Sequence, residues 1–326
     1  MLINTLSPLR ETLLDRRQKL GAAAAVRGAA PGLDRLIGVV DAALARMESG
    51  SYGLCDTCHD PIETDRLLAD PLVRFCLDHL TAQQQRALEQ DLELAARIQR
   101  ELLPRLPFRI DRWEAAYAYQ PAGPVSGDYC DLIAAGDGDV HFIVGDVSGK
   151  GVAAAMLMAH LHAMFRTLIS LELPLADIME RASRLFCEST LPTHYATLVC
   201  GRARASGEVE VCNAGHVPPV VVKDGDVQII AAGGLPLGMF SEERFSTSQL
   251  RLSNDDVIVL CSDGVTEMEN PAGTDYGHQR VIEQVRGARD PRPDVVIGRC
   301  LDDLHGFRAG ASQRDDVTML LLQRSA

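Results

Sequence analysis

The chain has 326 residues, of which 46% are hydrophobic and 24% charged, and its formal net charge is −13. This length predicts two domains, or one large domain with a smaller module, and the acidic charge argues against broad binding to nucleic acid or anionic lipid. We find no apolar run of roughly 20 residues and no signal-peptide core at the start, so we expect a cytoplasmic protein that does not cross a membrane.

The first hundred residues have the composition of three helices. Leu13–Arg27 is rich in Ala, Leu, Arg and Gln, which are good helix formers, and Ala30-Pro31-Gly32 ends it. A second helix is predicted over Leu33–Met47, whose apolar residues recur on one face. A third begins near Thr81, a residue suited to the N-cap, and runs until Pro104. Its narrow apolar stripe predicts either pairing with another helix, such as its twin in a homodimer, or packing on its own domain.

Between the second and third helices lies a cysteine-containing segment. Cys55 and Cys58 are followed, after seventeen residues, by Cys76 and His79. Two short-spaced pairs at this separation are typical of a tetrahedral zinc site. Because four protein ligands leave no open position, we expect one structural zinc ion. His59 is the alternative fourth ligand, and a chance grouping of reduced cysteines is the alternative to zinc.

The residues around these ligands resemble the zinc finger of the DksA/TraR family, in which a helical hairpin precedes the finger. This resemblance implies that residues 1–80 form one module, with His79 in place of the fourth cysteine that members usually carry. The family acts on RNA polymerase through acidic residues at a coiled-coil tip. The corresponding segment here, Gly21–Gly28, lacks acidic residues, so polymerase binding is not carried over. The matching strings are Arg46–Cys58, Pro61-Ile62 and Asp65–Pro71.

From Trp113 onward, short strand-like runs alternate with turn signals. Lys223-Asp224-Gly225-Asp226 is a strong hairpin turn between two of these runs. Strands in hairpin series with helices in blocks predict an α+β fold, an antiparallel β-sandwich flanked by helices. Helices are predicted over Ala153–Leu171, Ile178–Thr190 and Val281–Leu304. Strands are predicted over Trp113–Tyr119, Val140–Val144, Tyr195–Arg202, Glu208–Asn213, Val220–Lys223, Val227–Ile230, Val257–Cys261 and Val317–Leu322.

Four aspartates in short motifs adjoin these runs. Carboxylates held at strand ends can converge on one point, where burying like charges unpaired is costly. A cation between them is therefore predicted, and an all-oxygen ligand set favours Mg²⁺ or Mn²⁺. Two such ions can lower the pKa of a water that then attacks phosphorus in line. The alternative is that each aspartate caps a turn. The motifs are Ser126-Gly127-Asp128, Gly145-Asp146-Val147-Ser148-Gly149, Ser262-Asp263-Gly264 and Asp315-Asp316-Val317-Thr318.

The order of these motifs over Gln99–Leu322 resembles the SpoIIE/RsbU branch of the metal-dependent Ser/Thr protein phosphatases (PPM family). The resemblance implies the PPM phosphatase fold and two catalytic Mn²⁺ or Mg²⁺ ions. It further implies that Asp146 bridges both ions with the Val147 carbonyl as an added ligand, that Asp128 holds one ion, and that Asp263 and Asp315 hold the other. Asp316 would be a weaker ligand or lie behind the ligands. Further matching strings are Ile98–Pro104, Pro124–Asp131, Gly145–Ala154, Asn213–Pro219 and Ser262–Glu267.

These observations predict residues 1–80 as the helical hairpin and finger, 81–104 as a linker helix and 105–326 as the phosphatase domain. The resemblance implies a phosphorylated substrate protein, an anti-sigma-factor antagonist, and we expect a homodimer through the N-terminal and linker helices. Two alternatives remain, a pseudo-phosphatase scaffold and a regulator of the transcription machinery acting through the finger. Lys150 either meets substrate phosphate or is solvated, and His216 is either a general acid or a turn residue.

Overall fold

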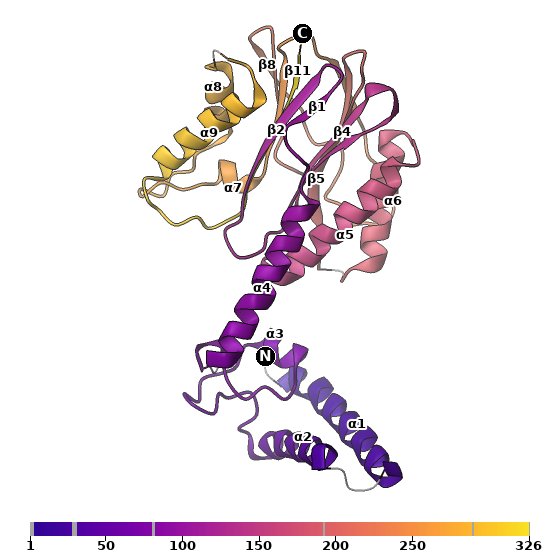
Figure 1. Ribbon diagram of the computed structural model, residues 1–326, viewed down its shortest axis with the longest axis vertical. Helices are drawn as coiled ribbons and strands as arrows, with labels where there is room; N and C mark the ends of the chain where they lie inside the picture. Colours follow the sequence, from indigo (N-terminus) through magenta and orange to yellow (C-terminus); the bar gives the residue numbers. More distant parts are fainter. Residues whose placement is uncertain (1–2, 28–30, 80–81, 192, 289, 326) are drawn as a thin grey trace. The chain divides into compact units, whose positions relative to one another are not determined.

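The structure is a computed structural model that describes residues 3–27, 31–79, 82–191, 193–288 and 290–325. The chain divides into two compact units, Met1–Asp91 and Leu92–Ala326. The boundary falls within helix α4 (Ala82–Leu102), which Figure 1 shows as one continuous ribbon. The first unit contains α1 (Ile3–Arg27), α2 (Pro31–Ser49), α3 (Thr64–Ala69) and a 3₁₀ turn at Leu77–His79.

The first unit has its own apolar core, in which the helical hairpin and the finger share side chains. Leu13 of α1 and Val40 and Ala43 of α2 are fully buried, and they belong to the same cluster as Cys55 and Ile62 of the finger. Small modules bury little apolar surface, so this shared core and the finger depend on each other for stability. The predicted hairpin is confirmed, although α1 begins ten residues before Leu13. The N-cap predicted at Thr81 lies outside the described residues.

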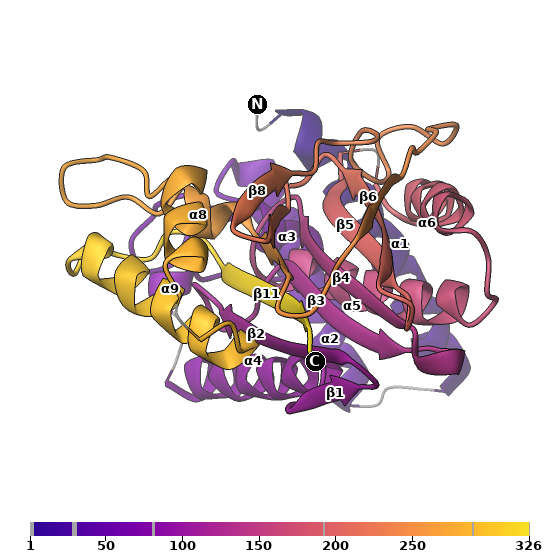
Figure 2. The same ribbon diagram turned by 90° about the horizontal axis from the view of Figure 1, so that it is seen from above.

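In the described part of the second unit, two antiparallel sheets pack face to face with helices outside. One sheet has the strand order β1-β2-β11-β10-β7-β8, and the other β3-β4-β5-β6-β9. Figures 1 and 2 show α8 and α9 on the first sheet and α5 and α6 on the second. The strands are β1 (Phe108–Ile110), β2 (Trp113–Gln120), β3 (Asp128–Ala134), β4 (Val140–Val147), β5 (Ala196–Ala203), β6 (Glu208–Ala214), β7 (Val220–Lys223), β8 (Asp226–Ile229), β9 (Ser248–Arg251), β10 (Val257–Cys261) and β11 (Val317–Arg324).

Apolar side chains fill the three spaces between these four layers. Trp113, Phe142 and Leu260 lie between the sheets, whereas Phe165 of α5 and Phe186 of α6 lie between the helices and the second sheet. Each sheet is therefore covered on one face by the other sheet and on the other face by helices, and this explains strands that carry apolar residues on both faces. The predicted α+β sandwich is confirmed. The helices of this unit are α5 (Gly151–Ile169), α6 (Leu175–Ser189), α7 (Asp263–Thr266), α8 (His278–Arg286), α9 (Pro293–Arg308) and a 3₁₀ turn at Gly136–Gly138.

Two of the differences from the sequence-based expectation concern helices. The single helix predicted over Val281–Leu304 is wrong, because α8 ends at Arg286 and α9 begins at Pro293. Proline lacks the amide hydrogen that a helix interior needs, and it is well placed at the first helical position. The sequence predicted no apolar run long enough to cross a membrane, but helix α5 is long and apolar enough to do so by length and composition. Its buried residues pack against the second sheet and α6, as expected of a core helix.

Candidate functional site

Asp128 and Asp146 lie directly opposite each other on neighbouring strands. Asp128 opens β3 and Asp146 is the penultimate residue of β4, and the two are Cα partners in the antiparallel register. Side chains at opposed positions project from the same face of a sheet, and like charges there destabilise the pair. Asp128 is only 1% exposed. The sheet therefore places two carboxylates side by side, with Asp128 buried and Asp146 half-buried.

Asp263 and Asp315 come from the other sheet. Asp263 begins α7 directly after β10, and Asp315 precedes β11, the antiparallel neighbour of β10. Ser262 joins these two segments, because its amide donates to the Thr318 carbonyl at 2.9 Å and its hydroxyl accepts from the Thr318 amide at 3.0 Å. A Cβ atom on Gly264 would lie 2.0 Å from the Asp316 carbonyl oxygen. Glycine is therefore needed at position 264 for this close approach of the two backbone segments.

The pKa shifts show that the carboxylates of the two sheets share one electrostatic environment. Burial, and next the charge of Asp146, raise the pKa of Asp128 well above its ordinary value. Burial, followed by the charges of Asp263 and Asp315, raises the pKa of Asp146 to about 7. Burial and then Asp315 also raise the pKa of Asp263. Among the described residues, the structure thus gathers the four predicted aspartates at one end of the sandwich.

This environment fits divalent cations. The Oδ2 atom of Asp128 is buried and has no hydrogen-bond partner among the residues that the structure describes. The hydroxyls of Thr318 and Ser262 face the carboxylate and partly oppose the rise of its pKa. An acceptor-only group without a donor is costly inside a protein unless it binds a cation. Oxygen ligands of this kind suit Mg²⁺ and Mn²⁺. Unlike the four finger ligands, the oxygens of the four aspartates do not form a group in which all ligand atoms lie within 4.8 Å of one another.

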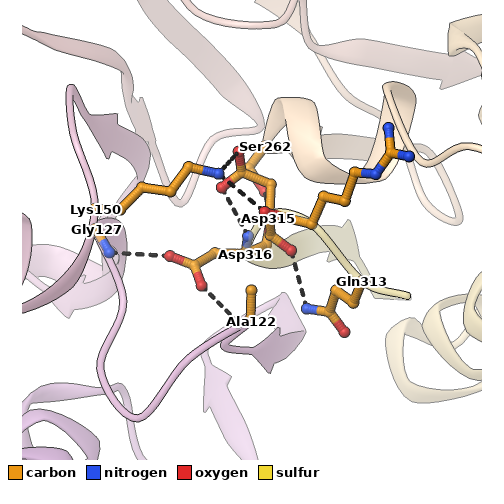
Figure 3. Close-up of polar contacts among 8 residues, drawn as sticks. Ala122, Gly127, Lys150, Ser262, Gln313, Asp315 and Asp316 are labelled. Atoms are coloured by element: carbon orange, nitrogen blue, oxygen red, sulfur yellow. Dashed lines mark hydrogen bonds and ion pairs between the residues drawn. The ribbon is translucent and has the colours of Figure 1, made fainter. Parts of the chain in front are cut away.

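Asp316 anchors the loop before β3. Its Oδ2 accepts the Gly127 amide at 3.0 Å and its Oδ1 accepts the Ala122 amide at 2.7 Å, as Figure 3 shows. These bonds occupy both carboxylate oxygens on the backbone next to Asp128. Of the two roles that the resemblance leaves for Asp316, the contacts favour the one behind the ligands.

Gln99 is a residue whose part in the site the sequence did not reveal. It lies on the last turns of α4, it is buried, and its amide group bonds to both backbone groups of Ser126. Nε2 donates to the Ser126 carbonyl at 2.7 Å and Oε1 accepts the Ser126 amide at 3.0 Å. Ser126 in turn accepts the Asp128 amide on its hydroxyl at 3.0 Å. The end of α4 is thus tied to the backbone that presents Asp128.

A second unpredicted group is an ion pair at β3 between a buried carboxylate and an arginine whose side chain is 46% exposed. Asp131 is fully buried, and Arg166 of α5 binds it with two bonds, Nε at 2.9 Å and an amino nitrogen at 2.8 Å. Tyr129 donates to the same carboxylate at 3.2 Å, and His162 Nδ1 lies 3.5 Å away. A bidentate arginine gives this pair a defined orientation. It fixes α5 against the strand that carries Asp128.

His216 is buried and does not reach solvent. Its Nδ1 lies 2.9 Å from the Thr197 hydroxyl, and the Asn213 side chain bonds to both its backbone groups. Burial lowers the pKa of His216 to about 4, so the ring is neutral at pH 7. A general acid must be protonated at the working pH. The structure therefore favours the turn-residue interpretation of His216 over the general-acid one.

The finger ligands also come together. The side-chain ligand atoms of Cys55, Cys58, Cys76 and His79 all lie within 4.8 Å of one another, and His59 is not part of this group. Cys76 Sγ is 3.2 Å from His79 Nδ1 and 3.8 Å from Cys58 Sγ. Three sulfurs and one imidazole nitrogen form a ligand set typical of structural zinc.

Comparisons with known proteins give the family and the fold of this chain. Residues 136–325 match the family of Stage II sporulation protein E (SpoIIE), and residues 50–78 match the prokaryotic dksA/traR C4-type zinc finger. The chain therefore belongs to the SpoIIE family. The SiaA-PP2C domain of Pseudomonas aeruginosa is 21% identical, with a TM-score of 0.65 over 74% of this chain and 99% of that domain. At this identity the likeness shows the shared PP2C fold.

Three curated relatives come from two bacteria. Phosphoserine phosphatase RsbU of Bacillus subtilis (strain 168) is 24% identical over 74% of this chain and 72% of its own length. Phosphoserine phosphatase RsbP of the same organism is 28% identical over 55% of this chain. Protein IcfG of Synechocystis sp. (strain ATCC 27184 / PCC 6803 / Kazusa) is 26% identical over 72% of this chain. The chain spans only 46% of RsbP and 42% of IcfG.

Proposed function

We propose that this chain is a metal-dependent protein phosphatase that hydrolyses phosphoserine or phosphothreonine on a regulatory protein. The observation that carries the proposal is the convergence of Asp128, Asp146, Asp263 and Asp315 from distant parts of the sequence, with a raised pKa at the first three. Membership of the SpoIIE family and the names of RsbP and RsbU support the same reaction.

Each aspartate has a proposed part in the reaction. Asp146 lies opposite Asp128, and its pKa is raised by Asp263 and Asp315 after burial, so it would bridge two Mn²⁺ or Mg²⁺ ions, with the Val147 carbonyl as a further ligand. Asp128 would complete one ion, and Asp263 and Asp315 the other. Bound ions would supply an activated water and neutralise phosphoryl charge. The protein holds these oxygens in place through the β3–β4 register and the Ser262–Thr318 bonds.

Phosphate release from phosphorylated regulatory proteins, with Mn²⁺ and with EDTA, tests the proposal. The wild-type chain should release phosphate only with the metal, and Asp263→Asn should lose activity by about 10³-fold or more, a typical cost for a lost electrostatic group. Asp294→Asn is the matched control, because Asp294 is an exposed carboxylate on α9. Equal activity of the two variants would contradict the proposal. The candidate substrates are anti-sigma-factor antagonists, and unphosphorylated antagonist should accumulate in the reaction.

The remaining predictions on cofactor, organisation and location are part of this proposal. One structural Zn²⁺ would occupy the Cys55, Cys58, Cys76 and His79 cluster. We infer a division into 1–80, 81–104 and 105–326, in a cytoplasmic homodimer joined through the N-terminal and linker helices. Exposed large apolar residues on α4, namely Leu88, Leu94 and Ile98, support helix pairing. Light scattering on the full chain tests it, since a monomer at all concentrations would exclude the dimer.

A further inference from the structure

Lys150 has an unusual position at the aspartate set. Among the basic side chains that the structure describes, that of Lys150 alone forms an ion pair with one of the four aspartates. Its Nζ lies 2.8 Å from Asp315 Oδ2 and donates to the Arg314 carbonyl at 2.9 Å (Figure 3). The Lys150 side chain is nevertheless 69% exposed. The ammonium group therefore stands at the solvent side of the site, where a substrate arrives.

The surroundings of Lys150 leave its side chain room to change partners. The flanking Gly149 and Gly151 both have positive φ, +102° and +74°, and a Cβ atom on either would meet nothing within 4 Å. Lys150 itself precedes α5 in an extended conformation. A lysine stem has four rotatable bonds and a compact charge, so its ammonium can move several ångströms at little cost. Because its side chain is largely exposed, Lys150 can exchange Asp315 for another partner.

Charge decides which contact survives when Asp315 binds a divalent cation. An ammonium hydrogen-bonded to the same carboxylate would lie next to the ion, where like charges repel. The neighbouring Arg314 is in a different situation, because its guanidinium bonds at 2.6 Å to Glu269, which is outside the aspartate set. Arg314 would keep its partner with ions bound, whereas Lys150 would lose its acidic partner.

We propose that Lys150 is the cationic contact for the phosphoryl group of the substrate. It pairs with Asp315 before the ions bind, and with a phosphoryl oxygen once the ions hold that carboxylate. The inference rests on the proposed phosphatase function and adds a residue to it. Ammonium-to-phosphate bonds are charge-assisted, and a phosphoryl dianion is the strongest acceptor that enters such a site. Lys150 would thus bind the phosphoryl group as arginine does in other phosphate sites.

The test compares Lys150→Met, Lys150→Arg and Arg314→Gln in the full chain. Inhibition by inorganic phosphate gives the affinity for the anion, and calorimetric titration with Mn²⁺ gives the affinity for the metal without turnover. Lys150→Met should weaken phosphate inhibition about tenfold and lower kcat/KM by about 10- to 100-fold. It should also bind Mn²⁺ more tightly, by up to about fivefold, because a competing cation is gone. Lys150→Arg should recover most of the phosphate affinity, and Arg314→Gln should resemble the wild type.

The outcomes separate this inference from the function on which it rests. A wild-type chain that shows no Mn²⁺-dependent hydrolysis refutes the phosphatase proposal itself. In an active enzyme, unchanged phosphate inhibition in Lys150→Met, or an equal loss in Arg314→Gln, refutes the role of Lys150 alone. Unchanged or weaker Mn²⁺ binding by Lys150→Met refutes the exchange of partners at Asp315.

Discussion

Replacing Asp146 with asparagine should stabilise the metal-free protein at pH 8. Folding raises the pKa of this carboxyl from 3.8 to about 7, chiefly through burial and then through Asp263 and Asp315. A carboxyl with a raised pKa favours the folded state while it is protonated, so its contribution is complete below about pH 4 and is lost as the pH rises through 7. A shift of about three pH units corresponds to about 4 kcal/mol, which is an upper value because part of the side chain meets solvent.

Asparagine has nearly the same shape and no charge, so Asp146→Asn removes this cost. In EDTA at pH 8 the variant should unfold at a temperature about 5–15 °C higher than the wild type, whereas at pH 4, near the pKa of the unfolded carboxyl, the two should differ little. Thermal unfolding followed by circular dichroism at both pH values measures the difference, with Asp294→Asn as the control. A variant that is less stable than wild type at pH 8 would refute the reasoning, since the aspartates would then not repel one another.

Three further predictions follow from single contacts. Cys76→Ala should abolish zinc binding and make the finger sensitive to protease, while the second unit keeps part of its Mn²⁺-dependent activity. A variant with full zinc content would count against the ligand set. Gln99→Ala removes both side-chain hydrogen bonds to Ser126, which should lower the free energy of unfolding by about 1–3 kcal/mol. The variant should keep its fold by circular dichroism and have a lower kcat, and an unchanged kcat would refute the role of Gln99 as an anchor. Gly264→Ala should cost about 1–3 kcal/mol or more in denaturant unfolding, because its Cβ would overlap the Asp316 carbonyl, and unaltered stability would show that the loops move apart freely.

The sequence predicted the architecture where local signals were strong. The runs Val220–Lys223 and Val257–Cys261 match the observed strands, and the turn between β7 and β8 has Asp224 and Gly225 at positive φ, as a two-residue hairpin requires. Strand β3 was missed because Asp128 and Asp131 break the apolar pattern expected of a buried strand. Asp131 is buried because it pairs with Arg166, and Asp128 because it faces the other aspartates, and both reasons depend on three-dimensional neighbours.

The sequence predicted which aspartates form the candidate site, and it did not predict which residues hold them in place. Motifs identify the aspartates, because each needs a particular local backbone that leaves a short sequence signature. Gln99 and Ser126 lie 27 positions apart, and Asp131 and Arg166 lie 35 apart. Pairs of this kind depend on how helices pack on the sheets, which periodicity does not encode. The anchors of α4 and α5 therefore required the structure.

The most direct test of the central claim is a crystal structure of the full chain grown with Mn²⁺, with anomalous scattering used to locate the metal. The account predicts two Mn²⁺ peaks about 3.5–4 Å apart, with Asp146 touching both, Asp128 on one, and Asp263 and Asp315 on the other. Peaks elsewhere, or an absence of metal at these carboxylates despite saturating Mn²⁺, would contradict it.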